Sequence, residues 1–296
     1  MAFEELFYHP YMRIDEELER EELTEIVVLK HAESVDRIFG NNWIDFYDKY
    51  GRRMDEKFPC KVLKLNELGM PVLLPKRFEG TENWLFDPPL SEISAMKSEE
   101  IGKHMKRFNF DKKLLGRYVY CSPCLCCVQT ADCILRGLDA PEVKIRIEPA
   151  LSNWKHQHEL YPPVWRGSSN YTFSTIANVD FAYRPVIAAS QWKSLETIEE
   201  FTNRLTGLTK LLQIKHRGRV GMLISHGSAI SVLGNYLNLD DLKLLSIGKI
   251  MRAFKLVPPL TSLTLRREMT GWITQLYPLK CSPLLMQSAD SSRRTI

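Results

Sequence analysis

Short apolar runs rich in β-branched residues constrain the fold of this chain more than any other feature of its sequence. Five such runs occupy residues 26–29, 118–121, 143–147, 220–224 and 262–265. Runs of this length and composition are typical of strands that are buried on both faces of a sheet. Between them, apolar residues recur at helical spacing in residues 91–105, 128–138 and 194–214. The sequence therefore predicts strands that alternate with helices.

This alternation predicts a mainly parallel central sheet with helices on both of its faces. We expect a three-layer α/β/α domain over residues 25–286, because a chain of 296 residues suits one large domain with insertions. Two stretches rich in aromatic residues interrupt the pattern, at about 41–89 and 152–191. Such insertions tend to shape ligand sites in open α/β sheets. Outside the domain, we expect a charged N-terminal extension at 1–24 and a disordered tail at 287–296.

The charge and hydropathy of the chain disfavour several classes of protein. A net charge of +4, from 40 basic and 36 acidic residues, is too balanced to indicate nucleic-acid binding. No stretch approaches the roughly 20 apolar residues that a membrane span needs. Residues 1–22 contain no apolar run of the kind found in secretory signals. We therefore expect a cytoplasmic protein without a membrane span.

The cysteines form an odd and clustered set. There are seven, and five of them fall between residues 121 and 133. In a reducing compartment this pattern predicts free thiols instead of a disulfide framework. Structural zinc usually needs a second pair of ligands, which the sequence does not offer beside the cluster, so we predict no metal site. No cysteine is followed six residues later by arginine, which excludes the usual cysteine-based phosphatase mechanism.

Two histidines directly follow predicted strands. His31 comes after the run at 26–29 and Lys30, and His226 comes after the run at 220–224 and Ser225. Ligand sites of α/β sheets lie at the carboxyl ends of strands, so neighbouring parallel strands would bring the imidazoles together. Such a pair suits phosphoryl transfer: one neutral nitrogen attacks phosphorus, and the other ring, protonated, binds an equatorial oxygen. Position alone favours a plainer interpretation, two hydrogen-bonded histidines at strand ends.

The residues around these histidines resemble three signatures of a known superfamily. Residues 30–33, Lys-His-Ala-Glu, resemble Arg-His-Gly-Glu. Residues 122–131, Ser-Pro-Cys-Leu-Cys-Cys-Val-Gln-Thr-Ala, resemble Ser-Pro-x-x-Arg-x-x-Gln-Thr-Ala. Residues 225–227, Ser-His-Gly, resemble a third signature, in which an apolar strand ends in a second histidine. In order and spacing the chain resembles the histidine phosphatase superfamily, and the resemblance implies a phosphoglycerate-mutase-like fold.

Three further segments narrow the resemblance. Residues 35–40, 145–151 and 183–185 are similar to the phosphatase modules of the suppressor of T-cell receptor signalling proteins and to ecdysteroid-phosphate phosphatases. The resemblance implies a phosphomonoester substrate, either phosphotyrosine or a phosphorylated small molecule, and a phosphohistidine at His31. It implies no metal or organic cofactor. Related signalling phosphatases are dimeric, so a homodimer is consistent with the resemblance.

The departures from these signatures fall on the residues that hold and cleave phosphate. Lys30 and Ser34 stand where the superfamily has arginine. Cys126 replaces the arginine of the second signature, and Asn153 replaces the acid that precedes a tryptophan. Hydrogen bonds to charged groups contribute roughly 1.5–3 kcal/mol each, so losing the arginines at positions 34 and 126 costs about 3–6 kcal/mol, or roughly 10²–10⁴ in rate. General acids contribute about 10²–10⁴-fold, and asparagine has no proton to give.

Some residues are candidates to compensate for these losses, although a surface or loop position is the simpler interpretation of each. Cys126 itself is either an exposed thiol, open to oxidation in a basic pocket, or a small apolar filler. The candidates for a replacement acid or guanidinium group are His156, His158, Glu33, Glu159, Arg37 and Arg184.

The sequence thus predicts a histidine-phosphatase-fold protein with a degraded active site. In this interpretation the chain is a pseudophosphatase, a module that binds a phosphorylated ligand or a partner protein. His31 and His226 persist as the catalytic pair of the resemblance, and Lys30 is the phosphate-binding residue that is left. The alternative is a weak or altered phosphomonoester phosphatase that acts through a phosphohistidine at His31.

Overall fold

A computed structural model describes residues 25–75, 84–85, 87–154, 177–186, 195–215, 220–234, 243–268 and 271–275. The extension predicted at 1–24 and the tail predicted at 287–296 lie outside the described residues. The insertion predicted at 152–191 is described only at its start and over residues 177–186.

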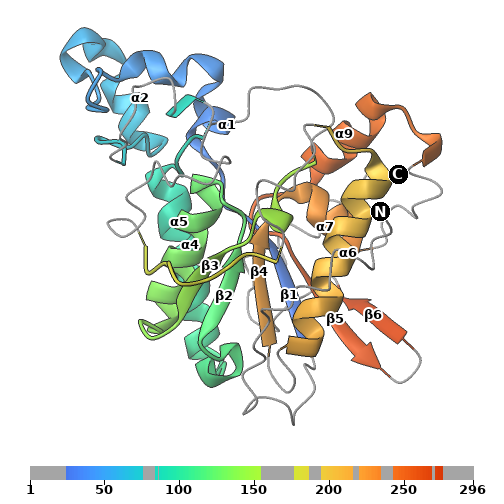
Figure 1. Cartoon of the computed structure of the whole chain (residues 1–296). Helices are drawn as coiled ribbons and strands as arrows, with labels where there is room; N and C mark the ends of the chain where they lie inside the picture. The colour runs from blue at the N-terminus through green and yellow to red at the C-terminus, as the bar shows by residue number, and fades with distance from the viewer. Residues whose placement is uncertain are drawn as a thin grey trace.

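The described strands form one sheet in the order β3-β2-β4-β1-β5-β6 (Figure 1). The four strands from β3 to β1 are parallel to one another, and β5 and β6 continue the sheet as antiparallel strands. The predicted α/β architecture with a mainly parallel sheet is confirmed. All five predicted strands are present, and β6 is an addition that the sequence pattern did not indicate. The strands are β1 (Glu25–Lys30), β2 (Tyr118–Cys121), β3 (Lys144–Ile147), β4 (Val220–Ser225), β5 (Ser262–Glu268) and β6 (Gly271–Gln275).

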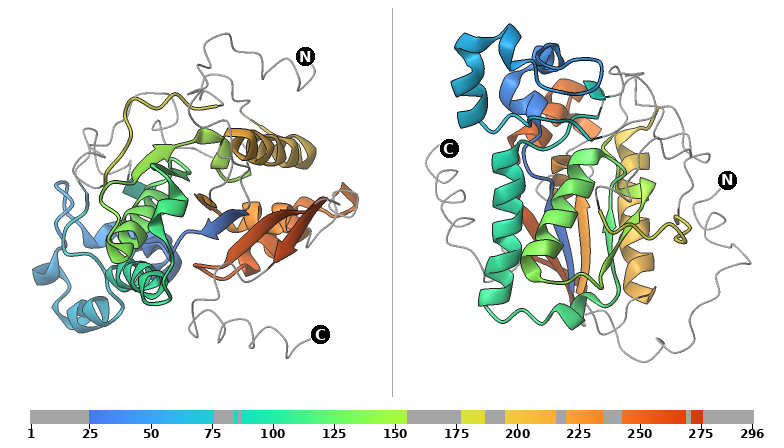
Figure 2. Two further views of the ribbon diagram at one scale, coloured as in Figure 1. Left: turned by 90° about the horizontal axis from the view of Figure 1, so that it is seen from below. Right: turned by 90° about the vertical axis from the view of Figure 1, so that its left-hand side faces the viewer.

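One face of the sheet is covered by α4 (Glu92–Arg107) and α5 (Leu125–Leu138), as Figures 1 and 2 show. Side chains alternate along a strand, so β1 turns Val27 and Leu29 toward this face, where they join the core beneath the two helices. The prediction placed the start of α5 at residue 128, three residues too late. The first turn of α5 therefore includes Cys126, which lies before the start of the predicted helix.

The opposite face is covered by α6 (Ile198–Lys215), α7 (Gly227–Leu233) and α9 (Ile247–Leu256). The remaining buried residues of β1, Ile26 and Val28, belong to this second core. The sequence pattern predicted α6, which begins four residues later than expected, but it predicted neither α7 nor α9. No described helix combines the length and the apolar character that crossing a membrane requires.

The insertion predicted at 41–89 is described over most of its length, and together with the preceding helix α1 it forms a small cluster of short helices (Figure 1). The cluster has its own hydrophobic core, centred on the fully buried Trp43. It follows β1 in the sequence and lies at the edge of the sheet formed by the carboxyl ends of the parallel strands, where His31 also lies. Its helices are α1 (Val35–Phe39), η3 (Asn41–Phe46), η4 (Asp55–Lys57), η5 (Pro59–Lys61) and α2 (Val62–Glu67).

Candidate active site

The carboxyl ends of β1 and β4 place His31 and His226 side by side. The two strands are parallel neighbours, and Lys30 of β1 is paired in register with Ser225 of β4, so the next residue of each strand lies at the same edge. The His31 backbone N–H also donates to the Ser225 carbonyl oxygen at 2.9 Å. The centroids of the two imidazole rings are 5.2 Å apart, and the ring planes are inclined at 73°.

The His31 imidazole is oriented by its neighbour in the chain. Its Nδ1 lies 2.6 Å from the carbonyl oxygen of Ala32. A carbonyl oxygen only accepts hydrogen bonds, so Nδ1 carries the hydrogen, and Nε2 of the neutral ring keeps its lone pair. The Ala32 backbone N–H donates to Thr130 Oγ1 at 3.0 Å, and the Thr130 hydroxyl donates to the Cys126 carbonyl at 2.7 Å. Thus α5 braces the residue that orients His31.

His226 is almost completely buried, with 8% of its surface exposed. Its Nε2 lies 3.0 Å from Ser122 Oγ and 3.8 Å from Cys127 Sγ. Burial lowers the pKa of His226 well below its usual value, and electrostatic repulsion by the nearby basic groups, His31 and Lys30 first, lowers that pKa further. This direction disfavours the protonated imidazole that the sequence led us to expect at His226.

Lys30, the predicted phosphate-binding cation, is already engaged by the protein. Its Nζ donates to the carbonyl oxygen of Val257 at 2.6 Å, at the C-terminal end of α9. Burial and the charge of Arg37 lower the pKa of Lys30 to about 8. The ammonium group therefore offers an incoming anion a weaker and less available charge than an exposed lysine does.

Ser34 and Cys126, at the two arginine positions, are also satisfied within the protein. Ser34 is buried, and its hydroxyl donates to Asp36 Oδ1 at 2.5 Å. Cys126 is 6% exposed and in hydrogen-bonding contact with Cys127 and His31. The hydrogen bond with Cys127 and burial raise the pKa of Cys126 well above its usual value. The suggestion of an exposed, readily oxidised thiol is therefore wrong, and the alternative of a small buried filler fits the structure.

Asn153, at the position of the missing acid, lies beside the start of α7. Its Oδ1 accepts hydrogen bonds from Ser228 Oγ at 2.7 Å and from the Trp154 backbone N–H at 3.0 Å. Ser228 is only two residues beyond His226. The structure thus brings position 153 next to the segment that carries the second imidazole.

The candidate replacements for the lost groups are placed less favourably. Arg37 is exposed, although its charge acts on the pKa of both Lys30 and His226. Arg184 is also exposed, and the charge of Glu33 raises the pKa of Lys30. Within the described part of the chain, no group of three histidine, cysteine or acidic side chains is arranged to hold a metal ion. His156, His158 and Glu159 lie outside the described residues.

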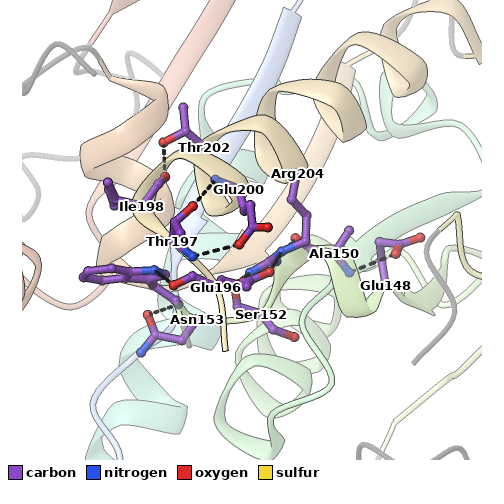
Figure 3. A network of polar contacts seen from close by, with 11 residues as sticks. Glu148, Ala150, Ser152, Asn153, Glu196, Thr197, Ile198, Glu200, Thr202 and Arg204 are labelled. Atoms are coloured by element: carbon purple, nitrogen blue, oxygen red, sulfur yellow. Dashed lines mark hydrogen bonds and ion pairs between the residues drawn. The ribbon is translucent and has the colours of Figure 1, made fainter. Parts of the chain in front are cut away.

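A polar network behind the pocket was missed by the sequence analysis (Figure 3). Arg204 of α6 forms two hydrogen bonds with the Glu196 carboxylate, and it also donates to backbone carbonyls of the segment that precedes Asn153. A signal for Arg204 did exist in the sequence: a charged residue stands between Phe201 and Leu205, inside the apolar stripe of a predicted helix. Buried charges are normally paired, so such a residue predicts an internal partner.

Comparison with known families gives a match over more than half of the chain. A sequence model of the histidine phosphatase superfamily (branch 1) matches residues 79–250. This stretch includes the second and third signatures, at 122–131 and 225–227, and begins after His31.

Two groups of curated proteins are similar in sequence. The ubiquitin-associated and SH3 domain-containing protein B of Mus musculus is 31% identical over 210 residues, which are 69% of this chain and 31% of that protein. The ecdysteroid-phosphate phosphatase of Drosophila melanogaster is 28% identical over 216 residues, which are 72% of this chain and 26% of that protein. The chain therefore spans about a third or less of the length of these relatives.

A solved structure with the same fold is that of the ecdysone phosphate phosphatase of Bombyx mori in complex with tungstate. The TM-score is 0.63 at 24% identity, and the alignment covers 88% of this chain and 94% of that chain. The phosphoglycerate-mutase-like fold expected from the signatures is thus confirmed.

Proposed function

The chain belongs to the histidine phosphatase superfamily, and on that premise we propose that its pocket binds a phosphorylated ligand without turning it over efficiently. One observation carries the proposal. The positions that the superfamily fills with two arginines and an acid hold Ser34, Cys126 and Asn153, and each of these uncharged side chains already has partners inside the protein. None of the three supplies a phosphate with a positive charge or an acidic proton.

The charge balance around the imidazoles supports the same proposal. A phosphoryl dianion is held most strongly by guanidinium forks, whereas lysine supplies only a point charge. Here the cation next to His31 in the sequence is the partly buried Lys30, whose pKa is lowered to about 8 and whose Nζ donates a hydrogen bond to the Val257 carbonyl oxygen. Because the pKa of His226 is also lowered, its ring acts at neutral pH as a hydrogen-bonding group and not as a cation.

Asn153 is a residue that can support ligand binding without supporting turnover. Cleavage of a phosphomonoester releases an alkoxide or phenoxide, which leaves faster when an acid gives it a proton. The Asn153 amide donates hydrogen bonds but has no acidic proton. A ligand can therefore be held there, while the departure of its leaving group receives no proton from this residue.

We propose phosphomonoesters of bulky alcohols or phenols as the ligand class. The names of the relatives support this choice: one is an ecdysteroid-phosphate phosphatase, and the others carry ubiquitin-associated and SH3 domains. A small phosphorylated molecule and a phosphotyrosine of a partner protein present the same phosphate to the imidazole pair. In this proposal the protein is cytoplasmic, and binding needs no cofactor.

A weak phosphatase is a second candidate, because one observation favours it. The bond from His31 Nδ1 to the Ala32 carbonyl leaves the Nε2 lone pair available to attack phosphorus. In that reaction a P–N bond forms to Nε2 as the P–O ester bond breaks, and the leaving oxygen takes its proton from water. A second water then cleaves the P–N bond, which releases orthophosphate and regenerates His31.

Calorimetry and a turnover assay with the purified full chain test the proposal. Phenylphosphonate, whose P–C bond cannot be hydrolysed, should bind, and the variant His31→Ala/His226→Ala should bind it at least about tenfold more weakly, a loss of about 1.4 kcal/mol. The matched control is His104→Ala on α4, outside the pocket, which should bind normally. With p-nitrophenyl phosphate, the unaltered chain should be no faster than His31→Ala. A kcat/KM of about 10⁴ M⁻¹s⁻¹ or more that His31→Ala abolishes would show an ordinary phosphatase instead.

A further inference from the structure

The segment that leads to Asn153 is held by its backbone carbonyl groups. Ser225, the last residue of β4, donates its hydroxyl to the Leu151 carbonyl at 2.6 Å. The guanidinium group of Arg204 donates through Nη1 to the carbonyls of Ala150 at 2.5 Å and of Ser152 at 3.3 Å. Three consecutive peptide groups are thus fixed immediately before position 153. Figure 3 shows Arg204 beside two of them, those of Ala150 and Ser152.

Arg204 is itself locked in place by Glu196. The Arg204 and Glu196 side chains are 4% and 6% exposed, and their two charged hydrogen bonds measure 2.7 and 2.8 Å. The backbone carbonyl of Glu196 accepts a hydrogen bond from Trp154 Nε1 at 3.0 Å. The pair therefore contacts the chain on both sides of Asn153, through the carbonyls before it and the indole after it.

A buried ion pair of this kind needs an explanation other than stability. Removing two charges from water costs several kcal/mol per ion, and apolar residues of similar volume often serve a core equally well. Apolar residues cannot supply N–H groups, however, and the Arg204 guanidinium group donates such groups to the backbone carbonyls of Ala150 and Ser152. The specific contribution of Arg204 is therefore geometric.

The side-chain amide of Asn153 also has a defined orientation. Its Oδ1 accepts from both Ser228 and the Trp154 backbone, so the oxygen and nitrogen ends of the amide are distinguished by their partners. Within the described residues, the amide nitrogen donates no hydrogen bond. Two N–H groups are thus held beside α7, and no described residue accepts a hydrogen bond from them.

We propose that Arg204, paired with Glu196, is a positioning residue that presents the Asn153 amide to the oxygens of a bound phosphoryl group. The inference rests on the proposed function, since it assigns Asn153 a contact with the ligand of that site. Asn153 is then a binding residue that has taken the place of an acid, and the ion pair keeps it in the place where the acid would act.

A double-mutant cycle tests the positioning role through phenylphosphonate affinity measured by calorimetry. Asn153→Ala should weaken binding about fivefold to tenfold, the value of one net hydrogen bond. Arg204→Met/Glu196→Met removes both charges together, so no unpaired buried charge remains, and it should weaken binding to a similar extent. All three substitutions combined should cost at most about twofold more than either variant, because they remove the same contact.

The matched control uses another ion pair in which one partner lies on α6. Lys243 Nζ and Glu199 Oε2 are 3.3 Å apart and both side chains are exposed. Among the described residues, neither forms a hydrogen bond or ion pair with the segment before Asn153. Glu199→Met/Lys243→Met should leave the affinity within about twofold of the unaltered chain, as expected for an exposed pair. Additive losses in the cycle would overturn the inference, since they would mean that Arg204 does not act through Asn153.

A second measurement decides the inference without any ligand. NMR can assign the side-chain amide protons of Asn153, because their signals are lost in Asn153→Ala. In the unaltered chain their chemical shifts should differ from random-coil values. In Arg204→Met/Glu196→Met the chemical shifts should move toward those values. If phenylphosphonate does not bind the unaltered chain, the proposed function fails, and these resonances still report whether the pair orders Asn153. Unchanged resonances in the folded double variant would refute the positioning role.

Discussion

Two parts of the candidate site can be compared directly: the strand ends that carry the imidazoles, and the positions where the proposed function places contacts with a phosphate, which we call the phosphate-facing positions. The first part is complete, with the rings of His31 and His226 5.2 Å apart. In the second part, Ser34, Cys126 and Asn153 carry no charge at neutral pH, because the pKa of the Cys126 thiol is raised well above its usual value. The comparison teaches that the arrangement of the two imidazoles does not depend on a cationic cage, by which we mean arginine side chains at positions 34 and 126.

The physical reason lies in what each part is made of. The strand ends belong to the core, since residues of β1 are buried on both faces of the sheet. Disturbing them disrupts packing and leaves backbone groups unsatisfied. The phosphate-facing side chains, in contrast, form hydrogen bonds with neighbouring residues. We therefore expect their replacement to change the affinity for an anion far more than it changes the stability of the fold.

The largest loss of stability is expected from a substitution where α4 and α5 cross, in the framework formed by the sheet and the helices packed on it. A Cβ added at Gly137 would lie 1.9 Å from the Glu99 carbonyl oxygen, and its other near neighbours are also backbone atoms of α4. Gly137→Ala should therefore destabilise the protein by about 3 kcal/mol in urea unfolding, at the upper end of overpacking effects. In the control Gly248→Ala on α9, the added methyl group meets nothing within 4 Å. That variant should be unchanged or up to about 1 kcal/mol more stable. Equal stabilities of the two variants would show that α4 and α5 do not pack as closely at Gly137 as the structure describes.

A smaller loss of stability is expected from substitution of Thr130, whose hydroxyl links α5 to the residue that orients His31. Thr130 is fully buried, and its hydroxyl joins the Ala32 backbone N–H to the carbonyl of Cys126. Thr130→Val leaves the Ala32 N–H without its partner and should lower the free energy of unfolding by about 2 kcal/mol. It should also weaken phenylphosphonate binding, because Ala32 orients His31. Thr130→Ser keeps the hydroxyl and should retain most of the stability; if it behaves like Thr130→Val, the hydrogen bonds are not what matters.

The sequence predicted the framework better than the rest because buried parallel strands have a strong local pattern. Apolar runs identified β1 to β5, and the two histidines followed from their positions at strand ends. The pattern missed α7 because its seven residues, Gly-Ser-Ala-Ile-Ser-Val-Leu, are all buried and show no polar face. It missed β6, which pairs only with β5 at the edge of the described sheet.

The partners of the phosphate-facing residues could not be predicted, because they depend on tertiary contacts. Lys30 binds Val257, which is 227 positions away in the sequence. The burial of Cys126 depends on the start of α5, which the sequence pattern placed too late. The resemblance to the superfamily indicated which residues stand at the positions of its arginines and its acid. Only the fold shows that these residues have partners inside the protein.

The smallest predicted effect concerns pH and the phosphate-facing side of the pocket. Lys30 has a pKa of about 8, so it is mostly charged at pH 7 and mostly neutral at pH 9. The affinity for sulfate, a dianion throughout this range, should fall by up to about tenfold between these pH values, in proportion to the protonated fraction. Lys30→Met should bind weakly and without this pH dependence, as titration calorimetry can show. A dependence that persists in Lys30→Met would assign it to another group.

Restoring the cage on the existing framework tests the central claim most directly. The variant Ser34→Arg/Cys126→Arg/Asn153→Glu returns two guanidinium groups and an acid to a pocket whose imidazoles are already in place. Its kcat/KM for p-nitrophenyl phosphate should exceed that of the unaltered chain by at least about 10²-fold, and a further His31→Ala change should abolish the gain. A folded variant with no gain would contradict the claim that only the charges are missing, as would an unaltered chain that is already equally fast.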